Sequence, residues 1–365
     1  MSFEPFRFVV LMTLAFLAPI SLAVEVFEDA SKTGAFNLTF TKRSDLSTNI
    51  ELCKRMGWDL AAEAAAKVDY VLSEESFEVY IPADYTGDKP YGLFVFCSAS
   101  PSGRPLGHIL KSLDEHHLIY VGPNKAGNDR VNRPRMGLMI DAALSMKARY
   151  NIDPERVYVS GVSGGGRIAS MLGVGYADIF HGGFYIIGCN FYRQEISIEQ
   201  KGAAFPKSYS VPPAKIFNFA RKQSKHVFLT GDTDPNREQT ETYYKAFKKD
   251  GFEHITYFQV PGMGHRPPDA EWFEKGMQAL DEKIEPITKP AAASAKPATR
   301  PAAAASQPTD PAAVADHLLA TARLYIDNHQ LELGRKKLAW IIENYPKTPA
   351  AAEAKKLLED LVKKQ

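Results

Sequence analysis

The chain has 365 residues, of which 44 are basic and 43 acidic, and its formal net charge is +1. This length allows two domains, or one large α/β domain with an appendage, and is ample for a sizeable hydrophobic core. The balanced charge gives no reason to expect nucleic acid or an acidic membrane surface as a partner. With 45% hydrophobic and 24% charged residues, the composition excludes wholesale disorder and a polytopic membrane protein.

The first 23 residues have the pattern of a secretory signal peptide. Arg7 precedes an apolar run from Phe8 to Ile20, and small residues suited to a signal peptidase follow at positions 21–23. The run is too short to span a bilayer comfortably. An uncleaved anchor or a buried helix is the alternative. We therefore exclude residues 1–23 from the fold and expect a secreted or periplasmic protein.

From Ser76 onward, short apolar runs alternate with longer amphipathic stretches, which is typical of βα units and a mostly parallel sheet. A short meander of strands is expected before this region, from residue 24. Phe77, Val79 and Ile81 alternate with polar residues, as in a half-buried edge strand. The segment 92–97 is continuously apolar, as in a central strand covered on both faces. Strands are expected at 77–81, 92–97, 118–121, 156–160, 183–188, 226–230 and 254–260, and helices near 135–150, 164–173, 236–250 and 268–284. The fold class predicted for residues 24–285 is a doubly wound α/β domain.

The composition changes abruptly after this domain. Residues 286–311 are rich in alanine and proline. Because prolines every few residues break any alanine helix, this segment is predicted to be a semi-extended linker. A second module, residues 312–365, must lie beyond it.

Residues 312–365 show helical periodicity throughout, with a helix-stopping pair at Tyr345-Pro346. Small residues, including Gly334, Ala351 and Ala354, stand where two helices would meet. This pattern resembles the tetratricopeptide repeats of bacterial envelope proteins. About one and a half repeats are present, whereas a stable solenoid usually needs three. The resemblance implies a small helical element that binds a protein partner or mediates oligomerisation; a helical hairpin without a partner is the alternative.

The strongest chemical motif is Gly161-Val162-Ser163-Gly164-Gly165, which follows a strand directly and opens a helix. The pattern G-x-S-x-G is weak by itself. A nucleophile elbow also needs a strand, a turn so tight that glycine flanks the serine, and a helix N-terminus facing the developing charge. All three are present, so Ser163 is predicted to be a nucleophile. The alternative is a glycine-rich turn with a spectator serine.

A serine hydroxyl needs a base to remove its proton and a carboxylate to orient that base. His265 follows the last strand in a glycine-containing loop, and Asp232 and Asp234 follow the preceding strand. All lie at the carboxyl ends of parallel strands, where a doubly wound fold forms its site. We prefer Asp234 as the acid because Asp232 is closer to the strand end and could form the turn through its side chain.

With these motifs, residues 76–284 resemble the α/β-hydrolase superfamily, especially secreted esterases of the polyhydroxyalkanoate depolymerase and feruloyl esterase group, with prolyl oligopeptidase-type peptidases as more distant relatives. The resemblance implies that Ser163 is the nucleophile, Asp234 the acid and His265 the base. It also implies that the backbone N–H of Gly164 forms one half of the oxyanion hole. Many of these esterases carry His-Gly after the strand at 92–97; here Cys97-Ser98-Ala99 stands instead, so Ser98 or Ala99 is expected to supply the second backbone N–H.

Loops that follow neighbouring strands are expected to set specificity. Asn128, Phe191 and Tyr192 lie in such loops and would suit an aromatic or sugar-bearing ester, although solvated loops explain them nearly as well. No spacing of cysteine or histidine indicates a metal site, and no cofactor is expected. Cys53, Cys97 and Cys189 allow one disulfide in an export compartment, but simple burial explains them equally well.

The sequence thus predicts an exported serine hydrolase that cleaves small-molecule or polymeric carboxylic esters through an acyl-enzyme. Two alternatives stay open. One is a serine peptidase of the prolyl oligopeptidase type, which the triad alone does not separate from an esterase. The other is a non-catalytic binding protein on a hydrolase scaffold, in which the C-terminal helices bind the partner.

Overall fold

A computed structural model describes residues 32–65, 69–196, 204–282 and 331–363, together with residues 312, 315, 316, 319, 322, 323 and 326. The expected signal peptide, residues 1–23, and the expected linker, residues 286–311, lie outside the described residues. Within the described residues, no helix combines the length and the apolar character needed to cross a membrane.

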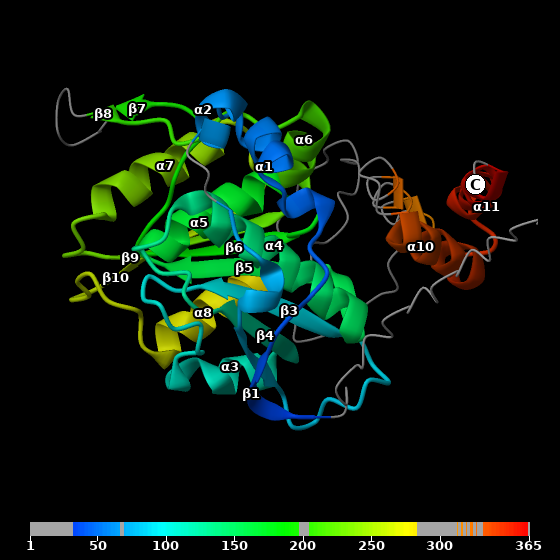
Figure 1. Ribbon diagram of the computed structural model, residues 1–365, viewed down its shortest axis with the longest axis horizontal. Coiled ribbons are helices and arrows are strands. Elements are labelled where there is room, and N and C mark those ends of the chain that lie inside the picture. Colours follow the sequence, from blue (N-terminus) through cyan, green and yellow to red (C-terminus); the bar gives the residue numbers. More distant parts are fainter. Residues whose placement is uncertain are drawn as a thin grey trace, which may run out of the picture.

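An eight-stranded, mostly parallel sheet forms the centre of the molecule (Figure 1). The strand order is β1-β2-β4-β3-β5-β6-β9-β10. β1 and β2 run antiparallel to their neighbours, and the other six strands are parallel. The strands are β1 (Gly34–Leu38), β2 (Phe77–Ile81), β3 (Tyr91–Cys97), β4 (Leu118–Pro123), β5 (Ile152–Val162), β6 (Gly182–Ile186), β9 (Lys225–Gly231) and β10 (His254–Val260). A separate hairpin pairs β7 (Glu195–Ile196) with β8 (Ala204–Phe205).

Helices cover both faces of this sheet (Figure 1). The helices of the α/β core are α1 (Asn49–Met56), α2 (Leu60–Ala65), α3 (Leu110–Glu115), α4 (Asn132–Arg149), α5 (Gly164–Gly175), α6 (Ala214–Lys222), α7 (Arg237–Lys249) and α8 (Ala270–Asp281), with short 3-10 turns at Asp45–Ser47, Leu72–Glu74 and Gly107–Ile109. Along β3, Leu93 and Val95 point into the cluster with α4 and α5, whereas Phe94 and Phe96 point into the cluster with α3 and α8. Burial on both faces requires apolar side chains at every position, which confirms the central strand predicted from the continuous apolar run.

Two details of the predicted layout were wrong. β2 is not an edge strand, because β1 pairs with it antiparallel, with Phe36 opposite Val79. The alternation along β2 reflects one buried and one partly exposed face: Phe77 is fully buried and Glu78 is not. It does not indicate a sheet edge, because pleating alternates side chains between faces whether or not a neighbouring strand is present. The expected N-terminal meander is also replaced, in residues 32–65, by one strand followed by helices.

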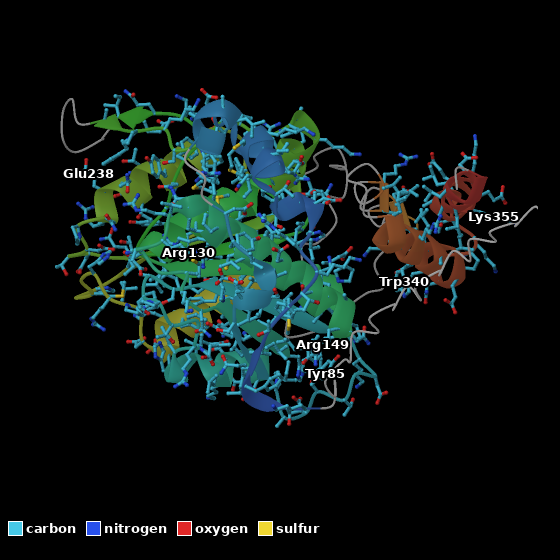
Figure 2. The ribbon with its side chains drawn as sticks, viewed as in Figure 1. Tyr85, Arg130, Arg149, Glu238, Trp340 and Lys355 are labelled. Atoms are coloured by element: carbon cyan, nitrogen blue, oxygen red, sulfur yellow. The ribbon has the colours of Figure 1, made fainter. Side chains whose placement is uncertain are left out.

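The C-terminal helices α10 (Leu331–Asn344) and α11 (Pro349–Lys363) form a hairpin around their own apolar cluster, which includes Leu338, Ile341 and Ala354. Trp340 lies on α10 (Figure 2). Its side chain is 44% exposed and packs edge-on against Tyr345. The mutual burial of apolar faces explains why this short segment is helical. Its likeness to a tetratricopeptide repeat stays a prediction.

Candidate active site

Ser163 lies in the sharp turn between β5 and α5, with φ of 55° and ψ of −116°. A residue with a side chain seldom adopts positive φ, and such strained backbone persists only where its surroundings hold it. The Ser163 N–H donates to the carbonyl of Ile186 on the neighbouring strand over 2.8 Å. The turn therefore presents the serine hydroxyl at the carboxyl end of the sheet.

Glycines allow the close backbone contacts that this turn requires. A Cβ atom built on Gly165 would lie 1.9 Å from the carbonyl oxygen of Cys97 at the end of β3. A Cβ atom on Gly188 would lie 2.2 Å from the carbonyl oxygen of Ser163. Both distances are far below van der Waals contact, so any side chain there would push the strand–turn–helix apart.

The hydroxyl of Ser163 contacts the imidazole of His265, and this imidazole contacts the carboxylate of Asp234. Ser163 Oγ is 2.9 Å from His265 Nε2, and His265 Nδ1 is 2.8 Å from Asp234 Oδ1. The Asp234 side chain is fully buried, whereas that of His265 is 38% exposed. The carboxylate also accepts hydrogen bonds from Thr230 Oγ1 and from the backbone N–H of Asn236. Asp234 is thus held in one orientation by groups on both of its oxygens.

This arrangement sets the position of the imidazole proton. An ionised carboxylate can only accept hydrogen bonds, so the proton of neutral His265 stays on Nδ1, facing Asp234. Nε2 is then left with a lone pair directed at the hydroxyl of Ser163. The cluster can therefore take a proton from Ser163 as its oxygen attacks an electrophile.

The two candidate carboxylates occupy different places. Asp234 contacts His265, whereas Asp232 is exposed and contributes its backbone N–H to the carbonyl of Val260. The turn-forming side-chain bond that we expected of Asp232 is made by Asp234, which accepts from the N–H of Asn236 two residues later. The reason offered for preferring Asp234 was therefore wrong, although Asp234 is the one brought to the imidazole.

The loop after β3 lies beside the first turn of α5. Ser98 and Ala99 are partly exposed there, and the carbonyl of Ala99 accepts from the backbone N–H of Asn128 over 2.9 Å. Gly164 is the first residue of α5, where helical N–H groups have no partner within the helix. The backbone N–H of Gly164 and the positive end of α5 can stabilise a developing oxyanion.

Two of the three predicted substrate-loop residues lie elsewhere. Phe191 and Tyr192 are buried in the core, where Phe191 stacks on Tyr243 and Tyr192 donates to Asp250. Aromatic rings bury more area than a loop surface offers them, so packing against α7 determines their positions. Asn128, by contrast, is exposed and lies against Gly164, beside the nucleophile.

The sequence pattern did not identify several residues that position this site. Thr230 and Asn236 hold Asp234, and the buried Arg135 contacts the loops that carry Ser98 and Asn128. Thr230 and Asn236 each stand within four residues of the predicted acid, which was an available signal. Arg135 had none, because nothing in its own neighbourhood on α4 points to a strand end.

The other titratable groups give no second reaction centre in the part of the chain that is described. No cluster of histidine, cysteine and carboxylate side chains suited to a metal ion occurs there. Cys53, Cys97 and Cys189 are buried and form no disulfide. Burial raises the pKa of the Cys97 thiol, partly opposed by Arg135, and it raises the pKa of Cys189 to about 12, so both stay protonated at neutral pH.

No protein-family model and no curated protein matches this chain. Solved structures that it resembles include an S-formylglutathione hydrolase from Staphylococcus aureus, with 11% identity over 68% of this chain and 99% of that chain and a TM-score of 0.45. A ferulic acid esterase from Anaeromyces mucronatus matches with 15% identity over 68% and 89% of the two chains and a TM-score of 0.45. A feruloyl esterase module from Clostridium thermocellum matches with 13% identity over 60% and 87% and a TM-score of 0.43.

We base the fold assignment on the chain itself. Six parallel strands (β3, β4, β5, β6, β9 and β10), the antiparallel β1 and β2 at one side, and the strand–turn–helix at Ser163 are all present. The serine, aspartate and histidine follow in the chain order expected of such enzymes. The α/β core therefore has the α/β-hydrolase fold.

Proposed function

We propose that this protein is an exported serine hydrolase that cleaves carboxylic esters through an acyl-enzyme, with Ser163 as nucleophile, His265 as base and Asp234 as the residue that orients it. One observation carries the proposal: a continuous hydrogen-bonded chain of 2.9 Å and 2.8 Å links Ser163 Oγ, the imidazole and a fully buried carboxylate. The strained turn at Ser163 supports it, because such strain is retained where it presents a reacting group.

In the first half of the reaction, Ser163 Oγ attacks the ester carbonyl carbon while His265 Nε2 takes the hydroxyl proton. The carbonyl oxygen becomes an oxyanion beside the N–H of Gly164. The C–O bond to the alcohol then breaks, and the imidazolium gives its proton to the departing oxygen, which leaves an acyl-serine. In the second half, His265 takes a proton from water, the hydroxide attacks the acyl carbon, and the carboxylic acid is released as Ser163 regains its proton.

A fluorophosphonate probe and p-nitrophenyl acetate test this proposal on the mature protein. We expect covalent labelling and ester hydrolysis by the wild type, and loss of both in Ser163→Ala. Ser102→Ala is the matched control, because it removes an exposed hydroxyl from another loop. Equal labelling of wild type and Ser163→Ala would refute the assignment of the nucleophile.

The acyl group and the leaving group need a separate panel. Acetyl, feruloyl and hydroxyalkanoate esters are compared at equal enzyme concentration, together with short peptide anilides. We expect turnover of at least one ester class and none of the anilides. Faster cleavage of the anilides would instead indicate a peptidase with the same catalytic groups.

Export is the second element of the proposal, and it rests on the sequence of residues 1–23. We expect the protein to be released from the cell or to accumulate in the periplasm, with a mature N-terminus directly after Ala23. N-terminal sequencing of the exported protein measures this directly. A cytoplasmic protein that retains Met1 would contradict it.

We further propose that the C-terminal helices bind a protein partner and do not take part in catalysis. Lys337 on α10 lies 3.4 Å from Glu155, near the start of β5, whereas Ser163 follows the end of the same strand. A chain that ends at residue 285 should therefore keep kcat/KM for p-nitrophenyl acetate within about twofold of the full chain. Loss of hydrolysis by a folded, truncated chain would show that the helices complete the site. A full chain that binds esters without hydrolysing them would indicate a binding protein.

A further inference from the structure

Asn128 occupies a special position between the two loops that would surround a substrate carbonyl. Its backbone N–H donates to the carbonyl of Ala99, and its side chain lies over Gly164. A Cβ atom built on Gly164 would come within 1.9 Å of Asn128 Oδ1 and 3.1 Å of Asn128 Nδ2. A side chain at position 164 would therefore displace the amide of Asn128 from its place against the first turn of α5.

The orientation of this amide follows from its neighbour Arg135. Arg135 Nη2 donates to Asn128 Oδ1 over 3.4 Å and to the carbonyl of Ser98 over 3.3 Å. A guanidinium has donors and no acceptor, so the atom of Asn128 that faces it must be the oxygen. The NH₂ group of Asn128 then faces away from Arg135. It has no hydrogen-bond partner among the described residues.

Arg135 itself is buried beside this amide. It is 3% exposed, and its Nε donates to the carbonyl of Ala126 over 2.8 Å. Its hydrogen-bond partners among the described residues are all neutral: Ala126, Cys97, Ser98 and Asn128. A buried cation with only neutral hydrogen-bond partners among the described residues favours negative charge nearby, and a tetrahedral intermediate at Ser163 would carry such charge.

We propose that the side-chain amide of Asn128 donates a hydrogen bond to the oxyanion formed at Ser163, in addition to the backbone N–H groups, and that Arg135 is a positioning residue that orients this amide. The inference rests on the proposed function, since it assigns a role in the same reaction. It accounts for three features of the described residues together: the amide of Asn128 placed against Gly164, its NH₂ group without a hydrogen-bond partner there, and a buried Arg135 whose hydrogen-bond partners there are neutral.

The first test uses the full mature chain and p-nitrophenyl acetate. Asn128→Ala removes the donor, and Asn128→Asp keeps the shape and the acceptor for Arg135 but replaces NH₂ by oxygen. We expect kcat to fall about 100-fold in both variants with KM within about twofold, because an oxyanion exists only after attack. Asn124→Ala is the matched control: Asn124 also bridges loops, through Gly103 and Ser76, and should keep kcat within about twofold.

The second test measures inhibition by a phenethyl trifluoromethyl ketone. A serine oxygen adds to the carbonyl carbon of this ketone, and the carbonyl oxygen becomes a stable oxyanion. The inhibition constant of this ketone should rise about as much as kcat falls in Asn128→Ala, whereas that of the matching methyl ketone should not change. A kcat of Asn128→Ala within threefold of wild type, or an increase in KM alone, would overturn the inference while leaving the serine hydrolase intact. A wild type that neither hydrolyses the ester nor reacts with a fluorophosphonate would overturn both proposals.

The third test addresses Arg135 through a double-mutant cycle. If Arg135 acts through Asn128, Arg135→Lys should keep more of kcat than Arg135→Met, and Arg135→Met should have little further effect in the Asn128→Ala background. Fully additive losses would contradict the positioning role. Should Arg135→Met fail to fold, the two Asn128 variants still decide the role of the amide.

Discussion

Two histidines at opposite ends of the sheet each contact a carboxylate, and their other neighbours give them different roles. His265, at the carboxyl end, has Asp234 on Nδ1 and the hydroxyl of Ser163 on Nε2. His116, two residues before β4, has Asp281 on Nδ1 at 3.1 Å and Glu274 on Nε2 at 3.0 Å. A histidine between two carboxylates is stabilised as a cation, whereas one between a carboxylate and a hydroxyl keeps a lone pair for proton transfer.

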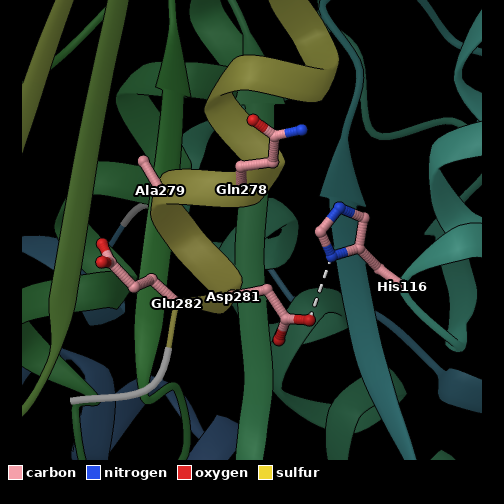
Figure 3. Close-up of a pocket in the computed structure, with 5 residues that line it drawn as sticks. All are labelled: His116, Gln278, Ala279, Asp281 and Glu282. Carbon is pink, nitrogen blue, oxygen red and sulfur yellow. Dashed lines mark hydrogen bonds and ion pairs between the residues drawn. The ribbon is translucent and has the colours of Figure 1, made fainter. Parts of the chain in front are cut away.

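The surroundings of His116 are those of a structural ion-pair network. Arg156 donates to both oxygens of Asp281, at 2.8 Å and 2.7 Å, and Tyr158 donates to Oδ1 at 2.7 Å. These bonds join the end of α8 to the starts of β4 and β5. A shallow pocket of about 440 Å³ adjoins the network, lined by His116, Gln278, Ala279, Asp281 and Glu282 (Figure 3). The described residues that line this pocket carry no hydroxyl or thiol group. The contacts of His116 are therefore those of a stabilising ion pair, whereas His265 alone of the two contacts a serine hydroxyl.

The largest expected effect separates the two histidines by activity. His265→Gln should lower kcat/KM for p-nitrophenyl acetate about 10⁴-fold, because the proton acceptor for Ser163 is lost. His116→Gln, the matched control, should stay within about twofold while the protein remains folded. Equal losses in the two variants would abolish the distinction drawn between them.

The second prediction compares the two carboxylates that follow β9. Asp234→Asn should lower kcat roughly 10³- to 10⁴-fold, because the amide no longer holds the imidazole proton on Nδ1. Asp232→Asn should have little effect, since Asp232 is exposed and its backbone N–H is unchanged. Steady-state hydrolysis of p-nitrophenyl acetate measures both, and a larger loss in Asp232→Asn would reverse the assignment.

The third prediction concerns stability at the other end of the sheet. Asp281→Asn should lower the free energy of unfolding by on the order of 3 kcal/mol, because Arg156 and His116 lose a shared, largely buried carboxylate. Glu271→Gln on the same helix is the control: its pair with Lys275 is exposed and should contribute less than about 1 kcal/mol. Urea unfolding measures both, and kcat of the folded Asp281→Asn protein should be unchanged. Similar losses in the two variants would contradict a specific role for the network.

The smallest effect is a pH dependence carried by His116. The hydrogen bond to Asp281 raises the pKa of His116 above its ordinary value of about 6.5, against the opposing effect of burial. The folded state therefore binds the proton more tightly, so this contribution to stability is fully present below about pH 6.5 and is lost as the pH rises through the raised pKa. The difference in the free energy of unfolding between wild type and His116→Gln should therefore decrease as the pH rises.

This difference must be measured against the wild type at each pH. Burial lowers the pKa of His226 to about 4, so that residue opposes folding as the pH falls below about 6.5, with the opposite sign. Because His226 is present in both proteins, its effect cancels in the comparison. A difference that grows between pH 6 and pH 9, or does not change, would contradict the role of His116 as a stabilised cation.

Much of the α/β core and of the candidate site was predictable from local patterns. The continuous apolar run of β3 indicated burial on both faces, and the strand–turn–helix around Ser163 indicated an exposed hydroxyl. His265 and the acidic pair after β9 could be placed because parallel strands bring their carboxyl ends to one edge. Each of these inferences depends on neighbours in the sequence or on the direction of a strand.

The remaining features depended on packing between distant segments. Phe191 and Tyr192 look like loop aromatics in the sequence, yet they lie buried against α7. In the sequence, Arg135 resembles any other arginine on a helix. Its role becomes visible only in the structure, where α4 packs beside the ends of β3 and β5.

The sequence by itself determined the alternation of strands and helices after residue 76, the turn at Ser163 and the types of residue at the strand ends, because periodicity and turn geometry act over a few residues. Only the tertiary structure decided that Asp234 and not Asp232 reaches His265, that Asn128 lies over Gly164, and that His116 sits between two carboxylates. Hydrogen bonds act over about 3 Å, and the partners in these contacts are up to 165 residues apart in the chain. Their meeting therefore depends on how the loops and helices pack on the sheet.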